Sequence, residues 1–231
     1  MLTGRSSLAD LTWQDAELHA SHSILAIPVG ATEQHGPHLP LSTDTDIAVA
    51  LAQSLSKQRS DTFVAPAIAY GSSGEHSAFA GTLSVGQDAT ELLLVELGRS
   101  ASDSFSRTLF ICAHGGNHEP VSRAEQRLRS EARSVRSFSP SWPGDAHAGR
   151  VETSLMLALH PERVHGDRAV AGATAPLKTF LPTLRDSGVR AVSENGVLGD
   201  PTGASADEGR SLICEALGQL IALVESWDAD T

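Results

Sequence analysis

The sequence contains few aromatic residues and few cysteines. Its 231 residues include six Phe, three Trp and one Tyr, so we expect a core built mainly from Ala, Leu, Val and Ile. Cys112 and Cys214 are the only cysteines, and they show neither CxxC spacing nor the pattern of a disulfide framework. Scarce, unpatterned cysteine is typical of proteins in a reducing compartment, and we expect a cytoplasmic protein.

Excess positive charge and long apolar runs are also missing. The chain has 28 acidic and 17 basic residues, for a net charge of −11, which is the opposite of a nucleic-acid-binding footprint. No stretch approaches the roughly 18 uninterrupted apolar residues of a membrane-spanning helix. The N-terminal stretch MLTGRSSLADLTW lacks the apolar centre of a secretion signal. The composition therefore predicts neither a nucleic-acid partner nor a membrane partner.

Short apolar runs alternate with helical patterns along the chain. We expect strands at residues 23–29, 62–67 and 107–113, and helices at residues 8–20, 44–58, 88–102, 120–133, 151–159 and 210–227. The Ser/Pro-rich stretch 137–144 and the Gly-rich stretch 196–209 are expected to be loops. Residues 1–231 are thus predicted to form one α/β domain, with a mostly parallel sheet covered by helices on both faces.

A group of metal-ligand residue types directly follows the first predicted strand. Glu33 and His35 are two residues apart, so they share a face in an extended segment. Asp44 follows at the predicted start of a helix. One alternative is that Asp44 caps the helix and His35 is an ordinary loop residue. We favour metal ligands, because active sites of α/β proteins lie where strands end in loops.

A second candidate group follows the third predicted strand. That apolar strand ends at His114, and Gly115 and Gly116 come next. Two glycines allow backbone amides to approach a bound anionic group. We expect His114 to be a metal ligand, with the two glycine amides contacting substrate. The alternative is a plain turn with Asn117 as a helix cap; His118 fits a helix start better than a ligand.

The third group surrounds the predicted helix at residues 151–159. Glu152 shares a helical face with Leu155, Met156 and Leu159, so its carboxylate is expected to point inward. A buried carboxylate requires a partner, which is either a metal ion or a cation such as Arg150.

Two further segments are candidates for contact with the reacting groups. His147 is either a proton carrier near the site or a histidine of a surface loop. In the Gly-rich loop at residues 70–82, Glu75 and His76 are expected to face substrate. The alternative for that pair is a solvated surface turn.

The donor set predicts the class of reaction. Mixed carboxylate and imidazole ligands suit Zn²⁺, Mn²⁺ or Fe²⁺ better than Ca²⁺. The sequence has no P-loop, GxGxxG, GxSxG or HExxH motif. Two divalent ions about 3.5–4 Å apart, sharing one carboxylate, would activate water for hydrolysis. The rival from another class is a catalytically silent metal-binding scaffold.

These motifs together resemble the creatininase (creatinine amidohydrolase) family. The resemblance rests on GATEQHGPHLPLSTDTDIA at residues 30–48, HGGN at 114–117 and HAGRVETSLMLAL at 147–159. It implies a three-layer α/β/α fold with a dinuclear metal centre, often in a hexamer, so we expect a homo-oligomer. The family pattern places Glu33, His35, Asp44 and His114 at metal-ligand positions, with Asp44 bridging, and gives proton transfer to His147.

The chain departs from the family pattern at two places. Creatininase has a liganding carboxylate where this chain has Gly116, so Glu152 is expected to complete the second metal site. The stretch at residues 142–146, WPGDA, lacks the aromatic clamp for a small cyclic substrate, which argues against creatinine.

Two other segments, at residues 70–82 and 191–210, resemble a family branch that trims a modified ribosomal precursor peptide. The implied reaction is cleavage near the carboxyl end of that peptide, releasing a cross-linked dipeptide derived from Val and Tyr. A small cyclic amide or formamide is the alternative substrate.

The expected mechanism is metal-assisted amide hydrolysis. One ion is expected on Glu33, Asp44 and His114, and the other on His35, Asp44 and Glu152. A bridging water attacks the amide carbonyl. Amides near Gly115 and Gly116 stabilise the oxyanion, and His147 protonates the leaving nitrogen.

Overall fold

The computed structural model describes residues 7–229, and its centre is a four-stranded parallel sheet. The strands are β1 (Ile24–Val29), β2 (Thr62–Val64), β3 (Arg107–Cys112) and β4 (Val135–Phe138), in the spatial order β2-β1-β3-β4. Every neighbouring pair is parallel. Residues 1–6, where the segment inspected for a secretion signal begins, and residues 230–231 lie outside the described part.

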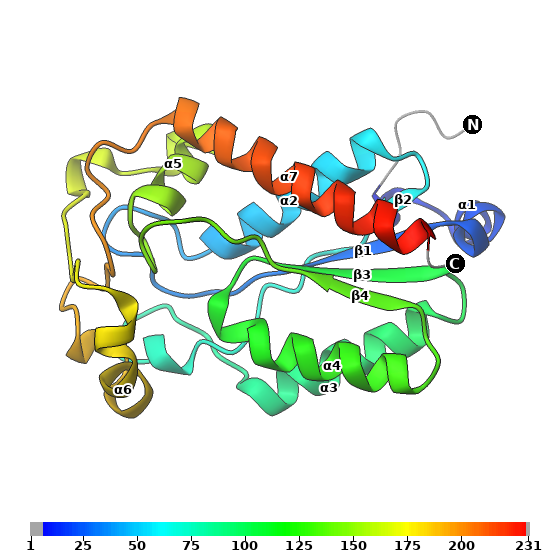
Figure 1. Ribbon diagram of the computed structural model, residues 1–231, viewed down its shortest axis with the longest axis horizontal. Coiled ribbons are helices and arrows are strands. Elements are labelled where there is room, and N and C mark those ends of the chain that lie inside the picture. Colours follow the sequence, from blue (N-terminus) through cyan, green and yellow to red (C-terminus); the bar gives the residue numbers. More distant parts are fainter. Residues whose placement is uncertain (1–6, 230–231) are drawn as a thin grey trace.

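Helices cover both faces of the sheet (Figure 1). The larger helices are α1 (Trp13–His19), α2 (Thr43–Gln58), α3 (Gln87–Ala101), α4 (His118–Ser130), α5 (Arg150–Leu159), α6 (Leu177–Ser187) and α7 (Ala206–Ala229). Helices α2, α5 and α7 lie on one face, and α3 and α4 lie on the other. The predicted α/β fold with a parallel central sheet and helices on both faces is confirmed. No described helix is long and apolar enough to cross a membrane.

The core consists of two apolar layers, one on each side of the sheet. Along β1, Ile24 and Ala26 pack toward α2, α5 and α7, whereas Leu25, Ile27 and Val29 pack toward α3 and α4. All six residues of β1 are buried, as expected for a parallel strand covered on both faces. This two-sided burial leaves only the ends of the strands free to carry polar chemistry.

Strand β4 and helix α6 are not among the predicted elements. The sequence predicts a loop over residues 137–144, but β4 occupies Val135–Phe138. Only its two end residues are buried, so this short edge strand carries no readable alternation. Helix α6 has Leu177, Phe180, Leu181 and Leu184 at helical spacing, but it contains Pro182, which disfavours a helix interior, and it buries none of its residues.

Helix α7 begins earlier than predicted, at Ala206 instead of residue 210. The sequence pattern placed Gly209 in a loop. In the structure Gly209 lies inside the helix, where a Cβ would come 1.9 Å from the carbonyl oxygen of Ser154. The glycine therefore permits close packing of α7 on α5 and does not interrupt the helix.

Candidate active site

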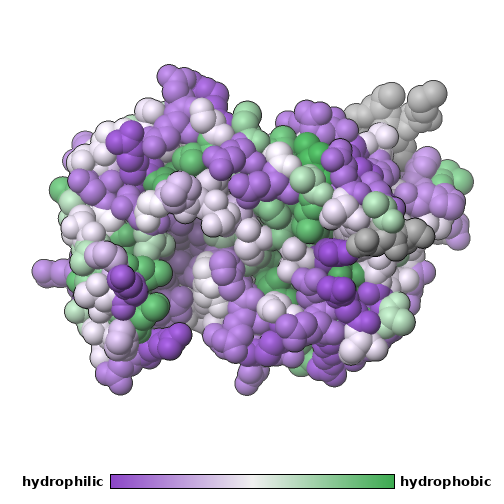
Figure 2. Space-filling model, viewed as in Figure 1, coloured by the Kyte–Doolittle hydropathy of each residue, from purple (hydrophilic) through white to green (hydrophobic). Residues whose placement is uncertain are grey.

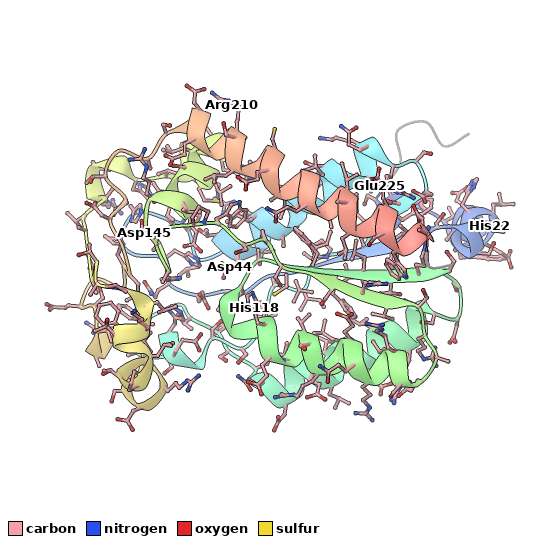
Figure 3. The ribbon with its side chains drawn as sticks, viewed as in Figure 1. His22, Asp44, His118, Asp145, Arg210 and Glu225 are labelled. Atoms are coloured by element: carbon pink, nitrogen blue, oxygen red, sulfur yellow. The ribbon has the colours of Figure 1, made fainter. Side chains whose placement is uncertain are left out.

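The candidate residues gather at the carboxyl edge of the sheet. Glu33 follows β1, His114 follows β3, Asp44 is the second residue of α2, and Glu152 lies in the first turn of α5. The chain leaves β1 toward β2 on one side and returns as β3 on the other, so the loops after β1 and β3 diverge. A crevice at such a switch point is where ligands bind in open parallel sheets. Figure 3 places Asp44 near these strand ends, and Figure 2 shows a hollow between α6 and the start of α4.

Glu33 lies at the centre of the group and is fully buried. Its Oε1 lies 3.3 Å from His76 Nε2, and its Oε2 lies 3.2 Å from His114 Nε2. Among the residues that the structure describes, neither carboxylate oxygen accepts a hydrogen bond of good geometry. A buried carboxylate in this condition is costly, so Glu33 has oxygens to spare for a cation.

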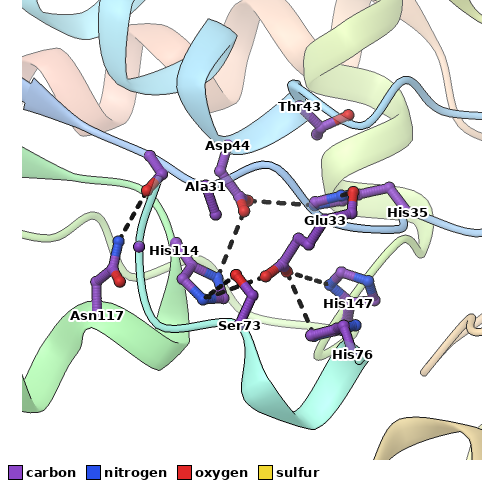
Figure 4. A network of polar contacts seen from close by, with 12 residues as sticks. Ala31, Glu33, His35, Thr43, Asp44, Ser73, His76, His114, Asn117 and His147 are labelled. Carbon is purple, nitrogen blue, oxygen red and sulfur yellow. Dashed lines mark hydrogen bonds and ion pairs between the residues drawn. The ribbon is translucent and has the colours of Figure 1, made fainter. Parts of the chain in front are cut away.

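Asp44 lies between two histidines that come from different loops (Figure 4). Its Oδ1 is 3.2 Å from His35 Nε2, and its Oδ2 is 3.4 Å from His114 Nδ1. Ser42, not Asp44, occupies the N-cap position of α2. The capping alternative for Asp44 is therefore wrong, because its side chain turns into the site.

Backbone carbonyls orient the rings of both these histidines. His35 Nδ1 donates to the carbonyl of Glu33 at 3.1 Å, and His114 Nε2 donates to the carbonyl of Ser72 at 2.8 Å. A carbonyl can only accept, so in the neutral rings the opposite nitrogens carry lone pairs. Those nitrogens are the ones that face Asp44, which is how metal-binding histidines are usually held.

Glu152 also turns inward, as its helical face predicts. Its Oε2 accepts a hydrogen bond from the Ala148 amide at 2.5 Å and lies 3.9 Å from His35 Nε2. Arg150 pairs with Glu208 on α7 at 2.9 Å. The alternative in which Arg150 neutralises Glu152 is therefore wrong.

His147 and His76 complete the wall opposite Asp44. His147 is buried, with Nδ1 3.8 Å from Glu33 Oε1 and Nε2 2.8 Å from the carbonyl oxygen of Gln34. The ring centroids of His76 and His147 lie 4.5 Å apart. Both alternatives that placed these histidines on a solvated surface are wrong, since His76 is 4% exposed and His147 8%.

The two glycines after His114 differ in their surroundings. A Cβ on Gly116 would come 2.2 Å from the Ser72 carbonyl oxygen and 2.5 Å from His114 Nε2, with Glu75 Oε1 also close. A Cβ on Gly115 would meet nothing within 4 Å. Gly116 thus allows the loops after β2 and β3 to touch beside the His114 ring, and Glu75 lies at that junction.

The sequence patterns did not single out four buried polar residues around the site. Ser73 Oγ lies 3.5 Å from His114 Nε2, and His38 Nε2 bonds Thr153 Oγ1 on α5 at 2.9 Å. Asn117, considered above only as a cap, does occupy the N-cap position of α4, but its side chain joins the Ser72 amide to the Gly30 carbonyl. Gln34 is the fourth. Their positions next to predicted ligands were the available signal, but Ser, Asn and Gln are too common in loops to stand out.

The pKa values of Glu33, His35 and Glu152 are raised, whereas that of Asp44 is lowered because the charge and hydrogen bond of His35 outweigh its burial. Burial raises the pKa of Glu33 to about 8, helped by the charge of Asp44 and opposed by His114 and His35. For His35, burial lowers the pKa, but the charge and hydrogen bond of Asp44 outweigh it and raise the pKa to about 10. Burial also raises the pKa of Glu152. Without a cation, a proton on Glu33 limits its repulsion with Asp44, and a proton on His35 pairs with the Asp44 carboxylate.

The other two histidines are kept neutral. Burial, then the charges of His35 and His114, lowers the pKa of His76 to about 3. Burial and the charges of His35 and His76 hold the pKa of His147 well below its ordinary value. The wall opposite Asp44 therefore supplies neutral imidazoles at neutral pH.

The side chains fit divalent cations. Three sets of three residues each bring one ligand atom apiece within 4.8 Å of one another: Glu33 with Asp44 and His114; His35 with Asp44 and Glu152; and Glu33 with His35 and His147. The first two sets are those expected from the sequence, and the third was not expected. Spare oxygens on Glu33 and Asp44 and the mixed N/O donor set suit Zn²⁺, Mn²⁺ or Fe²⁺.

Known proteins are similar to this chain in sequence and in fold. The mycofactocin precursor peptide peptidase of Mycolicibacterium smegmatis (strain ATCC 700084 / mc(2)155) is 48% identical over 220 residues, covering 93% of this chain and 89% of that protein. A creatininase crystal structure aligns with a TM-score of 0.85 over 96% of this chain and 98% of that one; at 24% identity it shows the fold alone. A structure described as "Creatininase Mn" aligns with a TM-score of 0.80 at 27% identity, over 95% and 97% of the two chains.

The family model for creatininase, described as creatinine amidohydrolase, matches residues 9–224. That range contains the four strands, helices α1 to α6, most of α7 and all the candidate ligands. The chain belongs to the creatininase (creatinine amidohydrolase) family.

Proposed function

We propose that this protein is a metal-dependent peptidase that cleaves the mycofactocin precursor peptide. The observation that carries the proposal is the convergence of Glu33, Asp44 and His114 with His35 and Glu152 at one sheet edge. The identity of 46–48% to proteins named mycofactocin precursor peptide peptidase supports the choice of substrate. The predicted product is the cross-linked dipeptide derived from Val and Tyr at the carboxyl end.

The proposed metal centre holds two divalent ions. Glu33, Asp44 and His114 would hold one, and His35, Asp44 and Glu152 would hold the other, with Asp44 shared. When bound, such ions supply an activated water molecule and polarise the amide carbonyl. Both oxygens of Glu33 and the Oδ2 of Asp44 accept no hydrogen bond of good geometry within the described residues, which supports this assignment.

The chain's own groups would manage the protons and the developing charge. His147 Nδ1 faces the site, while its Nε2 is held by the Gln34 carbonyl. It is therefore placed to take a proton from the attacking water and return it to the leaving amine. The amides of Gly115 and Gly116, with Glu75 and His76 across the gap, are the proposed contacts to the scissile amide.

The cellular compartment and the oligomeric state are also part of the proposal. Both cysteines are free, with Cys112 buried and Cys214 exposed, which supports a reducing, cytoplasmic setting. A homo-oligomer, such as the hexamer implied by the family resemblance, stays a prediction that mass measurement in solution would test.

Hydrolysis of a small cyclic amide is the second candidate, favoured by 28% identity to creatinine amidohydrolase of Pseudomonas putida over 76% of this chain. Manganese-loaded protein should be incubated separately with the modified precursor peptide and with creatinine, and the products identified by mass spectrometry. We expect release of the dipeptide and no turnover of creatinine. Turnover of creatinine alone would favour the second candidate.

A Glu33→Gln variant should lose dipeptide release while keeping its helical circular dichroism. Glu119→Gln is the matched control, because Glu119 is exposed on α4 and pairs with Arg123. Full activity of Glu33→Gln would contradict the proposed metal centre, and absence of hydrolysis despite full metal occupancy would favour the scaffold alternative.

A further inference from the structure

Gln34 lies between two candidate ligands, Glu33 and His35, and its own side chain is 5% exposed. Its Oε1 accepts a hydrogen bond from the Gly36 amide at 2.8 Å, and its Nε2 donates to the Gly196 carbonyl at 3.0 Å. A backbone N–H cannot accept and a backbone carbonyl cannot donate. These two contacts therefore fix which end of the Gln34 amide is oxygen and which is nitrogen.

The fixed amide determines where the proton of His76 lies. Gln34 Nε2 is 2.8 Å from His76 Nδ1, and the second N–H of the amide points to this ring nitrogen. His76 Nδ1 must then accept, so the neutral ring carries its proton on Nε2. That nitrogen faces Glu33 Oε1 at 3.3 Å. His76 thus presents an N–H to the centre of the site.

The backbone carbonyl of Gln34 determines where the proton of His147 lies, and His147 turns a lone pair, not an N–H, toward the site. His147 Nε2 lies 2.8 Å from the Gln34 carbonyl oxygen and 3.1 Å from Gln34 Nε2. Both protons of Gln34 Nε2 already point to the Gly196 carbonyl and to His76 Nδ1. The Gln34 carbonyl can only accept. His147 therefore carries its proton on Nε2, and its Nδ1, 3.8 Å from Glu33 Oε1, presents a lone pair to the site.

Contact with the loop at residues 193–197 holds Gln34 in this position. A Cβ on Gly196 would lie 2.0 Å from Gln34 Oε1, and Gly196 has a φ of +81°. Only glycine satisfies both the close approach and the left-handed backbone. Asn195 closes the same loop by accepting hydrogen bonds from Ser193 Oγ at 2.7 Å and from the Val197 amide at 3.1 Å.

We propose that Gln34 is a positioning residue that assigns different roles to His76 and His147. His147 can take a second proton on Nδ1 and still keep its bond to the Gln34 carbonyl. His76 cannot, because its Nδ1 is already occupied by the Gln34 amide. Gln34 therefore makes His147 the proton carrier and His76 a fixed N–H donor toward the substrate oxygen. The reaction part of this assignment rests on the proposed function, whereas the tautomers do not.

Gln34→Glu tests the assignment with almost no change in shape. The carboxylate still accepts from Gly36, but the donor beside His76 becomes an acceptor. The proton of His76 should then move to Nδ1, turning its lone pair toward Glu33. We expect kcat on the modified precursor peptide to fall by about 10²-fold, the low end of what positioned acid–base groups contribute, while KM changes little.

The tautomers are read by nitrogen NMR on zinc-loaded protein labelled with ¹⁵N in histidine. His76→Gln and His147→Gln variants assign the ring signals. Wild-type His76 should show a protonated Nε2 and an unprotonated Nδ1, and Gln34→Glu should reverse them. A wild-type His76 protonated on Nδ1 would overturn the proposal, even if no peptide is hydrolysed and the proposed function itself fails.

Two further variants separate positioning from stability. Asn195→Ala loosens the loop that holds Gln34 but touches neither ring, so it should keep both tautomers and most of kcat. If Gln34→Glu does not fold, Gln34→Met removes the bonds at similar length and should leave His76 as a mixture of tautomers. The proposal is wrong if Gln34→Glu reverses the tautomer yet keeps kcat within twofold, or if Asn195→Ala lowers kcat equally.

Discussion

His35 and Asp44 are nine residues apart in the chain, and their side chains meet at 3.2 Å inside the site. The loop between them leaves the end of β1 and returns at the start of α2. The second oxygen of Asp44 faces His114, which follows β3. One carboxylate therefore joins the loops after the two central strands, and this shared position makes a specific prediction about metal content.

Asp44→Asn should lose both metal ions, whereas Glu152→Gln should lose only one. The reason is that Asp44 belongs to two of the three ligand sets, and Glu152 to one. Metal content per chain after dialysis, measured by atomic emission, distinguishes these outcomes. Glu208→Gln is the control: Glu208 pairs with Arg150 near Glu152 and should leave the metal content unchanged. Equal metal loss in Asp44→Asn and Glu152→Gln would refute the shared arrangement.

Metal affinity should rise with pH. Glu33 has a pKa of about 8 and His35 of about 10 in the metal-free protein, so at pH 6 both carry protons that a cation must displace. Raising the pH removes this competition up to about pH 8 for Glu33 and further for His35. Two displaced protons predict a rise in affinity of up to about 100-fold per pH unit. Titration calorimetry with Mn²⁺ in two buffers of different ionisation enthalpy measures the proton release.

The dependence of metal affinity on pH has its own control variant. Glu33→Gln cannot release a proton from residue 33, so its affinity should depend less steeply on pH. An affinity that is constant between pH 6 and pH 8 in the unsubstituted protein would show that neither group is protonated in the metal-free state.

Gly116→Ala should inactivate the protein. Gly115→Ala should cause no steric clash and therefore no loss of activity from one. The methyl group at residue 116 would press on the Ser72 carbonyl and the His114 ring, whereas the space beside Gly115 is open. Gly116→Ala must therefore shift His114 away from Asp44 or separate two loops. Dipeptide release and metal content should fall together in this variant. Normal metal content in Gly116→Ala would show that the loops adjust without moving His114.

The stability of the protein should be far more sensitive to substitutions in the sheet core than to substitutions on the helix surface. Phe110 in β3 is fully buried, and Phe110→Ala is expected to lower the free energy of unfolding by about 3–5 kcal/mol. Thermal unfolding should then shift down by roughly 6–20 °C for a chain of this size. Leu92 on α3 is 54% exposed, so Leu92→Ala should change stability by about 0.5 kcal/mol or less.

Much of the fold was predictable because β1 and β3 are continuous apolar runs between helical patterns. Two-sided burial gives such strands a clear signature. Edge strand β4 buries only its two end residues, so it left no comparable pattern. Helix α6 has apolar residues at helical spacing, but Pro182 within it argues against a helix from sequence alone. Gly209 misled the prediction because its purpose is close helix packing, which depends on a neighbour distant in sequence.

The site was predictable where residue type alone carries the chemistry. Carboxylates and imidazoles that follow buried strands stand out, and Glu33, Asp44 and His114 do lie together. Backbone carbonyls orient His35, His114 and His147, and the Gln34 amide orients His76. Backbone carbonyls occur at every position, so no sequence pattern could distinguish those of Glu33, Gln34 and Ser72.

Helix α6 borders the hollow between itself and the start of α4, yet it buries none of its residues. Substitutions along its length should therefore cost the core little, while they change one wall of that hollow. The central strands, by contrast, tolerate almost no change. Natural variation and laboratory selection should therefore change α6 more freely than the strands, and leave the chemical centre and the fold as they are.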